Sequence, residues 1–379
     1  MKKNIIAITL IIFCLLMAGC GNEVKEKNNS EPSTNEITQP DKSGELKLSL
    51  EYNPKTDSPC GYDWGCMTES ENGYFFYDNV WTTYWDKESG LYLPLCSNPD
   101  CEHDTAECVA FGVKKDVNLS MSLYYYDGYI YKVGKESSKD GCYVNLYRIK
   151  EDGSEFEKYF SFFKAEDSNN VRTPELCFHR GYVYYEIPFQ SSMKLQRIRL
   201  GEEKSEVVYE MSGERQELYR IKAYGNHVFF QAGNFVDDKL TDINAGIYEY
   251  DITTNEVKQV LDGAIREYGI YENSLYYYKD NGINVLNFSD MSSERLIDGI
   301  SNNRTIIFSK EAMTIYDENI VQIFGYDGKK IVEIPENNVM DIEGFSNNIL
   351  FGHTSNNKVY YDITSDDKKW KVLDLGIDI

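Results

Sequence analysis

Four side chains of the types that bind metals stand close together in the segment LPLCSNPDCEHDTAECVAF. They are Cys96, Cys101, His103 and Cys108, in the pattern C-x4-C-x-H-x4-C. Three thiolates and one imidazole complete a tetrahedral site for zinc or iron, and the close spacing lets one short loop supply all four ligands. One interpretation of the loop at residues 96–108 is therefore a structural metal site, with zinc as its expected cofactor.

The same cysteines have two other interpretations. If the chain is exported, its cysteines are expected to pair as disulfides. Beyond Cys20, seven cysteines remain, an odd number: Cys60, Cys66, Cys96, Cys101, Cys108, Cys142 and Cys177. If three of them bind metal, four can pair, for instance Cys60 with Cys66 across the Gly-Tyr-Asp-Trp-Gly loop. Disulfides alone leave one thiol over, and a redox or catalytic thiol is the third interpretation.

No standard catalytic motif accompanies this cluster. The sequence contains no G-x-S-x-G elbow, no phosphate loop and no dinucleotide fingerprint. His179, His227 and His353 stand beside turns or strands without metal-ligand spacing, so we expect structural roles for them. Because the chain has 62 Asp and Glu residues, a carboxylate pair for glycoside hydrolysis is not readable from spacing. The sequence assigns no catalytic and no cofactor-binding residue.

The N-terminus predicts export and a lipid anchor. Lys2 and Lys3 precede an apolar run at residues 5–17 that is too short for an ordinary transmembrane helix, as in a signal peptide. The ending Met17-Ala18-Gly19-Cys20 resembles the bacterial lipobox, in which the cysteine is diacylated on sulfur and becomes the first residue. We therefore expect residues 1–19 to be a lipoprotein signal peptide and Cys20 to hold the protein at the extracytoplasmic face of the cell membrane.

Residues 20–44 predict a flexible tether, because they have almost no apolar side chains to bury. Residues 45–379 then form the folded domain, and no second apolar run of transmembrane length follows. Without residues 1–19 the chain has 37 Lys and Arg against 62 Asp and Glu, a net charge of −25. Such a surface repels phosphate backbones, so we expect no nucleic-acid partner.

A short signature recurs in the folded domain: a turn pair whose second residue is Gly or Asn, followed by alternating aromatic and aliphatic residues. Seven pairs fit it: Asn72-Gly73, Asp127-Gly128, Arg180-Gly181, Gly225-Asn226, Glu272-Asn273, Glu318-Asn319 and Asn347-Asn348. Gly and Asn enter left-handed turn conformations at low cost, so each pair predicts a hairpin between two strands. The pairs are 55, 53, 45, 47, 46 and 29 residues apart.

Several signatures are followed by a second strand pair, such as Leu146–Ile149 with Glu155–Tyr159. Four short antiparallel strands in about 45 residues are typical of a β-propeller blade. A β-sandwich does not explain one turn recurring at this spacing. We therefore predict an all-β propeller of six to eight blades, with seven preferred. The interval of 29 predicts a trimmed or irregular sixth repeat, and Glu45–Glu51 alternates suitably to complete a blade and close the ring.

The repeats resemble those of Gram-positive surface lipoproteins whose propellers are similar to the YWTD propeller of the low-density lipoprotein receptor and to TolB. The resemblance covers residues 71–376 and rests on the order of strand, turn glycine and aromatic strand before LYRIKEDGSEFEKYF. Tyr84-Trp85-Asp86 matches part of the YWTD signature, and the segment from Leu95 to Cys108 resembles one near the first blade of many such lipoproteins. The resemblance implies a surface propeller of unassigned function.

Together these features favour a monomeric, lipid-anchored propeller that acts as a binding or interaction module on the cell surface, with a glycan or a protein as its ligand. A propeller hydrolase or lyase acting on polysaccharide is the first alternative, and a structural envelope protein is the second. Two carboxylates facing each other across a deep central pocket would favour the enzyme. We expect most of the 31 Tyr and 18 Phe residues to pack between blades, although an exposed aromatic platform would suit a sugar.

Overall fold

The computed structural model describes residues 53, 56–57, 65–78, 80–165, 172–187, 192–212, 216–236, 239–240, 245–317, 319–335 and 339–375. These residues form strands, turns and loops without any helix. Consequently, this part of the chain offers no helix that could span a membrane. Cys20, the predicted signal peptide and the predicted tether lie outside the described residues.

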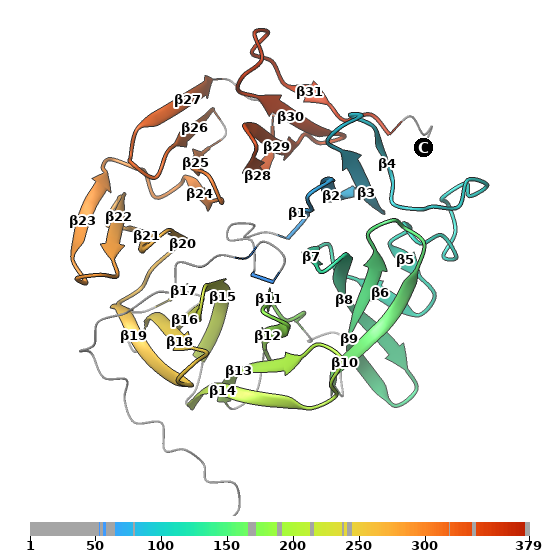
Figure 1. Ribbon diagram of the computed structural model, residues 1–379, viewed down its shortest axis with the longest axis horizontal. Helices are drawn as coiled ribbons and strands as arrows, with labels where there is room; N and C mark the ends of the chain where they lie inside the picture. The colour runs from blue at the N-terminus through green and yellow to red at the C-terminus, as the bar shows by residue number, and fades with distance from the viewer. Residues whose placement is uncertain are drawn as a thin grey trace, which may run out of the picture. The chain divides into compact units, whose positions relative to one another are not determined.

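Seven antiparallel sheets are arranged around a central axis, so the predicted all-β propeller with seven four-stranded blades is confirmed (Figure 1). In blades 1 to 3 the strands are β1 (Met67–Glu69), β2 (Gly73–Asp78), β3 (Trp81–Asp86) and β4 (Tyr92–Pro94); β7 (Tyr124–Tyr126), β8 (Tyr129–Ser138), β9 (Gly141–Lys150) and β10 (Phe156–Ala165); and β11 (Leu176–His179), β12 (Tyr182–Glu186), β13 (Ser192–Arg199) and β14 (Ser205–Ser212). In blades 4 and 5 they are β15 (Gln216–Tyr224), β16 (His227–Val236), β18 (Gly246–Asp251) and β19 (Glu256–Asp262); and β20 (Tyr268–Tyr271), β21 (Ser274–Lys279), β22 (Gly282–Asn287) and β23 (Ser293–Ile297). In blades 6 and 7 they are β24 (Thr305–Phe308), β25 (Met313–Tyr316), β26 (Ile320–Phe324) and β27 (Lys330–Pro335); and β28 (Asp341–Ser346), β29 (Ile349–His353), β30 (Lys358–Asp362) and β31 (Lys371–Val372).

Two blades carry short extra strands. In blade 4, β17 (Lys239–Leu240) pairs with the end of β16. In blade 2, β5 (Val113–Lys114) and β6 (Val117–Leu119) form a small hairpin, and β6 pairs with the second half of β8 while β7 pairs with its first half. The β5–β6 hairpin follows directly after the predicted Cys/His loop, so this loop leads the chain from blade 1 into blade 2.

The repeated turn signature joins the first two strands of most blades, as predicted. Both residues of the turns at Asp127-Gly128, Arg180-Gly181 and Asn347-Asn348 have positive φ, between 48° and 80°. This is the conformation that a two-residue type I′ hairpin turn requires, and it explains why Gly and Asn recur there.

The sixth copy of the signature was assigned to the wrong hairpin. Glu318-Asn319 lies between β25 and β26, the second and third strands of blade 6. The first hairpin of that blade turns through Ser309–Ala312, between β24 and β25. Blade 6 therefore has four full strands, and the predicted trimming of the sixth repeat is wrong.

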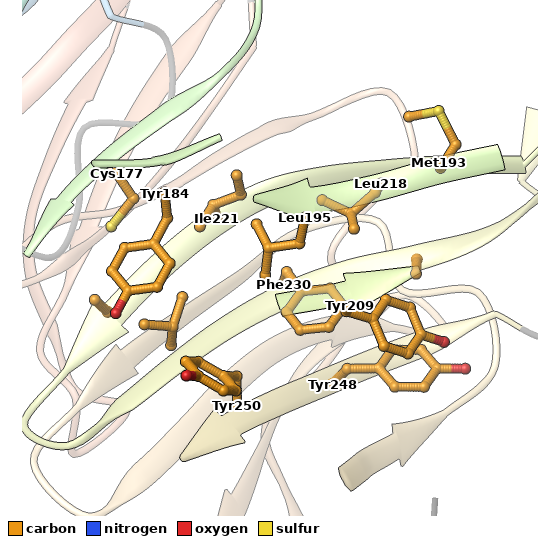
Figure 2. Close-up of a cluster of buried hydrophobic side chains, with 13 residues drawn as sticks. Cys177, Tyr184, Met193, Leu195, Tyr209, Leu218, Ile221, Phe230, Tyr248 and Tyr250 are labelled. Atoms are coloured by element: carbon orange, nitrogen blue, oxygen red, sulfur yellow. The ribbon is translucent and has the colours of Figure 1, made fainter. Parts of the chain in front are cut away.

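Seven clusters of buried apolar side chains fill the seven contacts between neighbouring blades. Figure 2 shows the contact of blades 3 and 4, where Tyr184 and Tyr209 from blade 3 meet Phe230 and Tyr248 from blade 4. The ring centroids of Tyr209 and Phe230 are 5.1 Å apart. The aromatic strand positions thus pack between blades, as predicted, and each aromatic pair adds to the hydrophobic stabilisation of the ring.

Blades 1 and 7 meet through side chains, and each takes all its strands from its own stretch of chain. Phe351 of blade 7 packs against Tyr74, Phe76 and Trp85 of blade 1, with ring centroids 4.7 to 5.5 Å apart. Ser346 Oγ also donates a hydrogen bond to Glu69 at 2.6 Å. Residues 45–51, predicted to complete a blade, lie outside the described part of the chain.

Candidate metal centre

The Cys/His loop is attached to a single strand of blade 1 at both ends. Leu95 N donates to Thr82 O at 2.9 Å, and Thr82 N donates to Ala110 O at 2.8 Å. Between these ends, Trp81 Nε1 donates to the carbonyl oxygen of His103 at 2.7 Å. Because Trp81 and Thr82 belong to β3, both ends of the loop are hydrogen-bonded to this strand, and the chain enters the loop from β4.

The predicted ligands come together in this loop. The Sγ atoms of Cys96, Cys101 and Cys108 and a ring nitrogen of His103 all lie within 4.8 Å of one another. Nδ1 of His103 is 3.4 Å from Sγ of Cys108. Sulfurs about 2.3 Å from one tetrahedral zinc ion are about 3.8 Å apart, so the four donors already lie near the spacing that zinc needs.

Tight turns bring the four residues together. Cys101 N donates to Asn98 O at 3.2 Å, and Cys108 N donates to Thr105 O at 3.1 Å. His103 has φ of 60°, which reverses the chain between these two turns, and its own N–H points at Sγ of Cys101 at 3.4 Å. The short spacing seen in the sequence is therefore used as predicted, with one loop supplying all the ligands.

Blade 2 supports the loop from the other side. Ser97 N donates to Gly153 O at 3.1 Å, in the turn between β9 and β10. Gly153 has φ of 70°, and a Cβ atom on it would lie 2.8 Å from Cys96 N. The cluster therefore occupies the contact between blades 1 and 2, where Cys96, Cys101 and Cys108 pack with the apolar side chains.

The electrostatics of the loop do not suit Cys108 as a nucleophile. Burial raises the pKa of Cys108 to about 12, and a hydrogen bond with Cys101 adds to this rise. At neutral pH, without a metal ion, this thiol is protonated, whereas nucleophilic cysteines have lowered pKa values. Burial also lowers the pKa of Lys114, whose Nζ donates to the carbonyl oxygens of Ala106, Cys108 and Val109. Lys114 therefore brings a positive charge beside the cluster.

Five cysteines in the described segments are free thiols: Cys66, Cys96, Cys101, Cys108 and Cys142. Within the loop, the four donor side chains lie where they could hold a metal ion. The disulfide between Cys60 and Cys66 stays a prediction, because Cys60 lies outside the described residues. Cys142 is buried in β9 of blade 2, and Cys177 is buried in the contact of blades 3 and 4, so both contribute to packing.

A pocket of about 480 Å³ opens beside the three sulfurs. Its lining comes from the loop and from the β9–β10 turn of blade 2: Cys96, Ser97, Asn98, Asp100, Cys101, Glu102, Asp104, Thr105, Glu107, Cys108, Val109, Gly153 and Ser154. Four of these residues are acidic and exposed. His103 is not part of the lining, so the pocket meets the cluster on its sulfur side.

A second group of donor atoms, which was not predicted from the sequence, lies in blade 4. His227, Glu249 and Asp251 have ligand atoms within 4.8 Å of one another. His227 and Glu249 are 2% and 1% exposed, and Nδ1 of His227 donates to Glu249. Only the register of β16 with β18, in which His227 faces Asp251, brings them together, and no local spacing signals it.

Other buried carboxylates near the axis are held by basic side chains. Arg180 Nε donates to Asp57 at 2.9 Å, and Arg220 Nε donates to Glu267 at 2.8 Å. Glu175 accepts a hydrogen bond from the backbone N of Arg220 at 2.7 Å. Glu175 and Glu267 thereby link blade 4 to its two neighbours, blades 3 and 5.

Comparisons with known proteins address the fold alone. No protein-family profile matches the chain, and no curated protein matches it. Among solved structures, it is similar to a prolyl endopeptidase, with a TM-score of 0.54 and 11% identity over 84% of this chain, and it spans 50% of that enzyme's length. It is also similar to an oligogalacturonate lyase in complex with manganese, with a TM-score of 0.52 and 10% identity over 80% of this chain and 85% of that one.

TolB from Acinetobacter baumannii is a more distant match, with a TM-score of 0.40 and 15% identity over 82% of this chain and 76% of that one. At these identities the similarities concern the propeller architecture, which the seven sheets already establish. Fold and site together define the class: a seven-bladed β-propeller with a Cys3His loop between its first two blades.

Proposed function

We propose that this chain is a lipid-anchored, extracytoplasmic β-propeller that acts as a binding module and holds a structural zinc ion in its Cys/His loop. The observation that carries the zinc assignment is the convergence of Cys96, Cys101, His103 and Cys108 to within 4.8 Å, with all three thiols free. Three thiolates and an imidazole are a donor set that zinc prefers. Zinc would fix the loop against blades 1 and 2 and so shape the surface that these blades share.

The partners of three acids, of which Asp57 and Glu267 are buried and Glu175 is partly buried, support a binding role. Asp57, Glu175 and Glu267 are each engaged by Arg side chains or backbone N–H groups. Acids that act in proton transfer must instead face the substrate. A polysaccharide hydrolase or lyase is therefore the second candidate, and the similarity to an oligogalacturonate lyase supports only its fold. The ligand that we propose is a glycan or a protein, bound by a monomeric propeller.

The lipid anchor rests on the sequence around Cys20. Cells that express the full chain and are fed a labelled fatty acid should incorporate the label into it, and the Cys20→Ser variant should remain unlabelled and leave the membrane fraction. A variant that stays in the membrane with its label would rule out Cys20 as the anchor. A glycan and peptide array probed with the mature chain, residues 20–379, tests the binding role.

The zinc site is tested by metal analysis of the mature chain purified without an affinity tag. We expect one zinc ion per chain in the wild type and a loss of zinc in Cys101→Ser. The matched control is Cys142→Ala, which removes a buried thiol from β9 and should leave the zinc content at one. A wild-type protein that contains no metal and shows disulfides among residues 96, 101 and 108 would contradict the proposal.

A further inference from the structure

The Cys/His cluster is open to solvent on one side. Its three cysteines contribute to the lining of the pocket of about 480 Å³, while His103 does not. Cys108 is 3% exposed, but Cys96 and Cys101 are only partly buried. Structural zinc sites are usually closed, with four protein ligands shielding the ion, whereas sites that exchange ligands keep an accessible side.

The charges around this opening are arranged asymmetrically. Asp100, Glu102, Asp104 and Glu107 line the pocket and are exposed. Lys114, the basic residue beside the cluster, is not among the lining residues and directs its ammonium group to backbone carbonyls of the loop. A concave surface lined by charges of one sign concentrates ions of the opposite sign and raises their association rates.

We propose that the pocket is the route by which a thiophilic divalent cation such as Zn²⁺ enters and leaves the Cys3His site while the propeller remains folded, so that the loop is an exchangeable metal-binding site on the protein's surface. This proposal rests on the zinc site of the proposed function and adds access and exchange to it. The four acids attract the hydrated cation, and the exposed sides of Cys96 and Cys101 are the first ligands that it meets.

The binding step balances in charge and protons. Each of the three thiols that coordinates the cation loses one proton to solvent, and the neutral His103 ring adds a lone pair. Three thiolates and one Zn²⁺ ion give the loaded site a net charge of −1. Lys114 is not part of the pocket lining, so it offsets this charge from beside the loop carbonyls.

The electrostatic part is tested by stopped-flow binding of Co²⁺, followed by its thiolate charge-transfer absorbance, to the metal-free mature chain. The variant Asp100→Asn/Glu102→Gln/Asp104→Asn/Glu107→Gln keeps all four ligands. A matched control, Glu203→Gln/Glu294→Gln/Asp298→Asn/Asp366→Asn, changes net charge equally at exposed sites of other blades. At low ionic strength we expect the pocket variant to bind about 10-fold more slowly than the control, with the difference shrinking at about 1 M salt.

The exchange part is tested by mixing the zinc-loaded mature chain with excess chromophoric chelator. We expect zinc to leave at least about 10-fold faster than the chain unfolds globally, as followed by tryptophan fluorescence. Equal association rates for the pocket and control variants, or zinc release only at the rate of unfolding, would overturn the proposal while leaving the zinc site itself intact. A wild-type chain that binds neither Co²⁺ nor Zn²⁺ would instead overturn the proposed zinc site, and the exchange route with it.

Discussion

Two groups of potential metal ligands in this propeller meet the same distance criterion but differ in almost every other respect. In the Cys/His loop and in the blade 4 cluster of His227, Glu249 and Asp251, the donor atoms lie within 4.8 Å of one another. The loop spans 13 residues and opens into a pocket. The blade 4 cluster joins two paired strands, with His227 and Glu249 almost fully buried.

The partners of the donor atoms distinguish the two groups. Nδ1 of His227 already donates to the Glu249 carboxylate, so each of these groups compensates the burial of the other. In the loop, the contacts among the donors are weak, with 3.4 Å between His103 Nδ1 and Cys108 Sγ. Proximity of metal-binding residue types is therefore not enough to identify a metal site. A metal site also needs donors that lack a better partner and a way for the ion to reach them.

Among the changes that test this comparison, we expect His227→Ala to have the largest effect on stability. The substitution leaves the Glu249 carboxylate buried without its imidazole donor, which should cost about 3 kcal/mol in the free energy of unfolding. Urea denaturation measures this loss, and the zinc content of the same variant should remain at one per chain. Loss of zinc from His227→Ala would mean that blade 4 holds the metal.

Removal of zinc by a chelator should affect the Cys/His loop and leave the blade 4 cluster unchanged. Removing zinc leaves the loop with weak internal contacts, so we expect amide hydrogen exchange over residues 96–112 to become about 100-fold faster, while amides of β16 and β18 keep their protection. Hydrogen–deuterium exchange with mass spectrometry resolves both regions in one experiment. Unchanged exchange in the loop after complete zinc removal would show that sheet contacts alone hold it.

A smaller effect is expected where blade 2 supports the loop. In Gly153→Ala, the added Cβ would lie 2.8 Å from Cys96 N, and the residue has φ of 70°, so the change should cost about 2 kcal/mol. We expect a lower melting temperature and weaker zinc binding. Gly201→Ala is the matched control, because Gly201 has φ of 88° with no neighbouring atom within 4 Å. Equal zinc affinities in both variants would contradict a supporting role for blade 2.

The smallest effect is expected from Lys114→Met, which keeps the aliphatic length of the side chain and removes its charge. Nζ donates to three loop carbonyls and offsets the negative charge of the loaded site. Zinc affinity measured by chelator competition should fall about 3- to 10-fold. The stability of the metal-free chain should change by less than about 1 kcal/mol, because Lys114 is only partly buried and water replaces its Nζ as the donor to the loop carbonyl oxygens. Unchanged affinity would rule out a role for this charge.

The sequence predicted those features that depend on local spacing. Turn pairs with Gly or Asn identified the first hairpins of most blades, and in three of these turns both residues have the positive φ that a type I′ turn requires. The first hairpin of blade 6 escaped detection because it closes differently: Ser309 Oγ donates to Ala312 O at 2.8 Å and accepts from Ala312 N at 3.2 Å. This turn is closed by a serine side chain and lacks the Gly or Asn that defines the turn signature.

The candidate site also has a part that the sequence predicts and a part that it does not. Cys96, Cys101, His103 and Cys108 were recognisable because one loop supplies them all. The pocket was not recognisable from the sequence, because two of its lining residues, Gly153 and Ser154, come from blade 2. The His227–Glu249 pair depends on the register of β16 with β18, which only the folded sheet specifies. Sequence spacing thus predicts contacts within a loop, whereas contacts between strands and blades require the three-dimensional arrangement.

X-ray absorption spectroscopy at the zinc edge, on the mature chain purified without a tag, tests the central claim most directly. We expect one zinc ion per chain with three sulfur ligands at about 2.3 Å and one nitrogen ligand at about 2.0 Å. The spectrum should keep this pattern in His227→Ala and lose it in Cys101→Ser. A spectrum dominated by nitrogen and oxygen ligands, or a protein without bound metal whose loop cysteines are joined as disulfides, would contradict it.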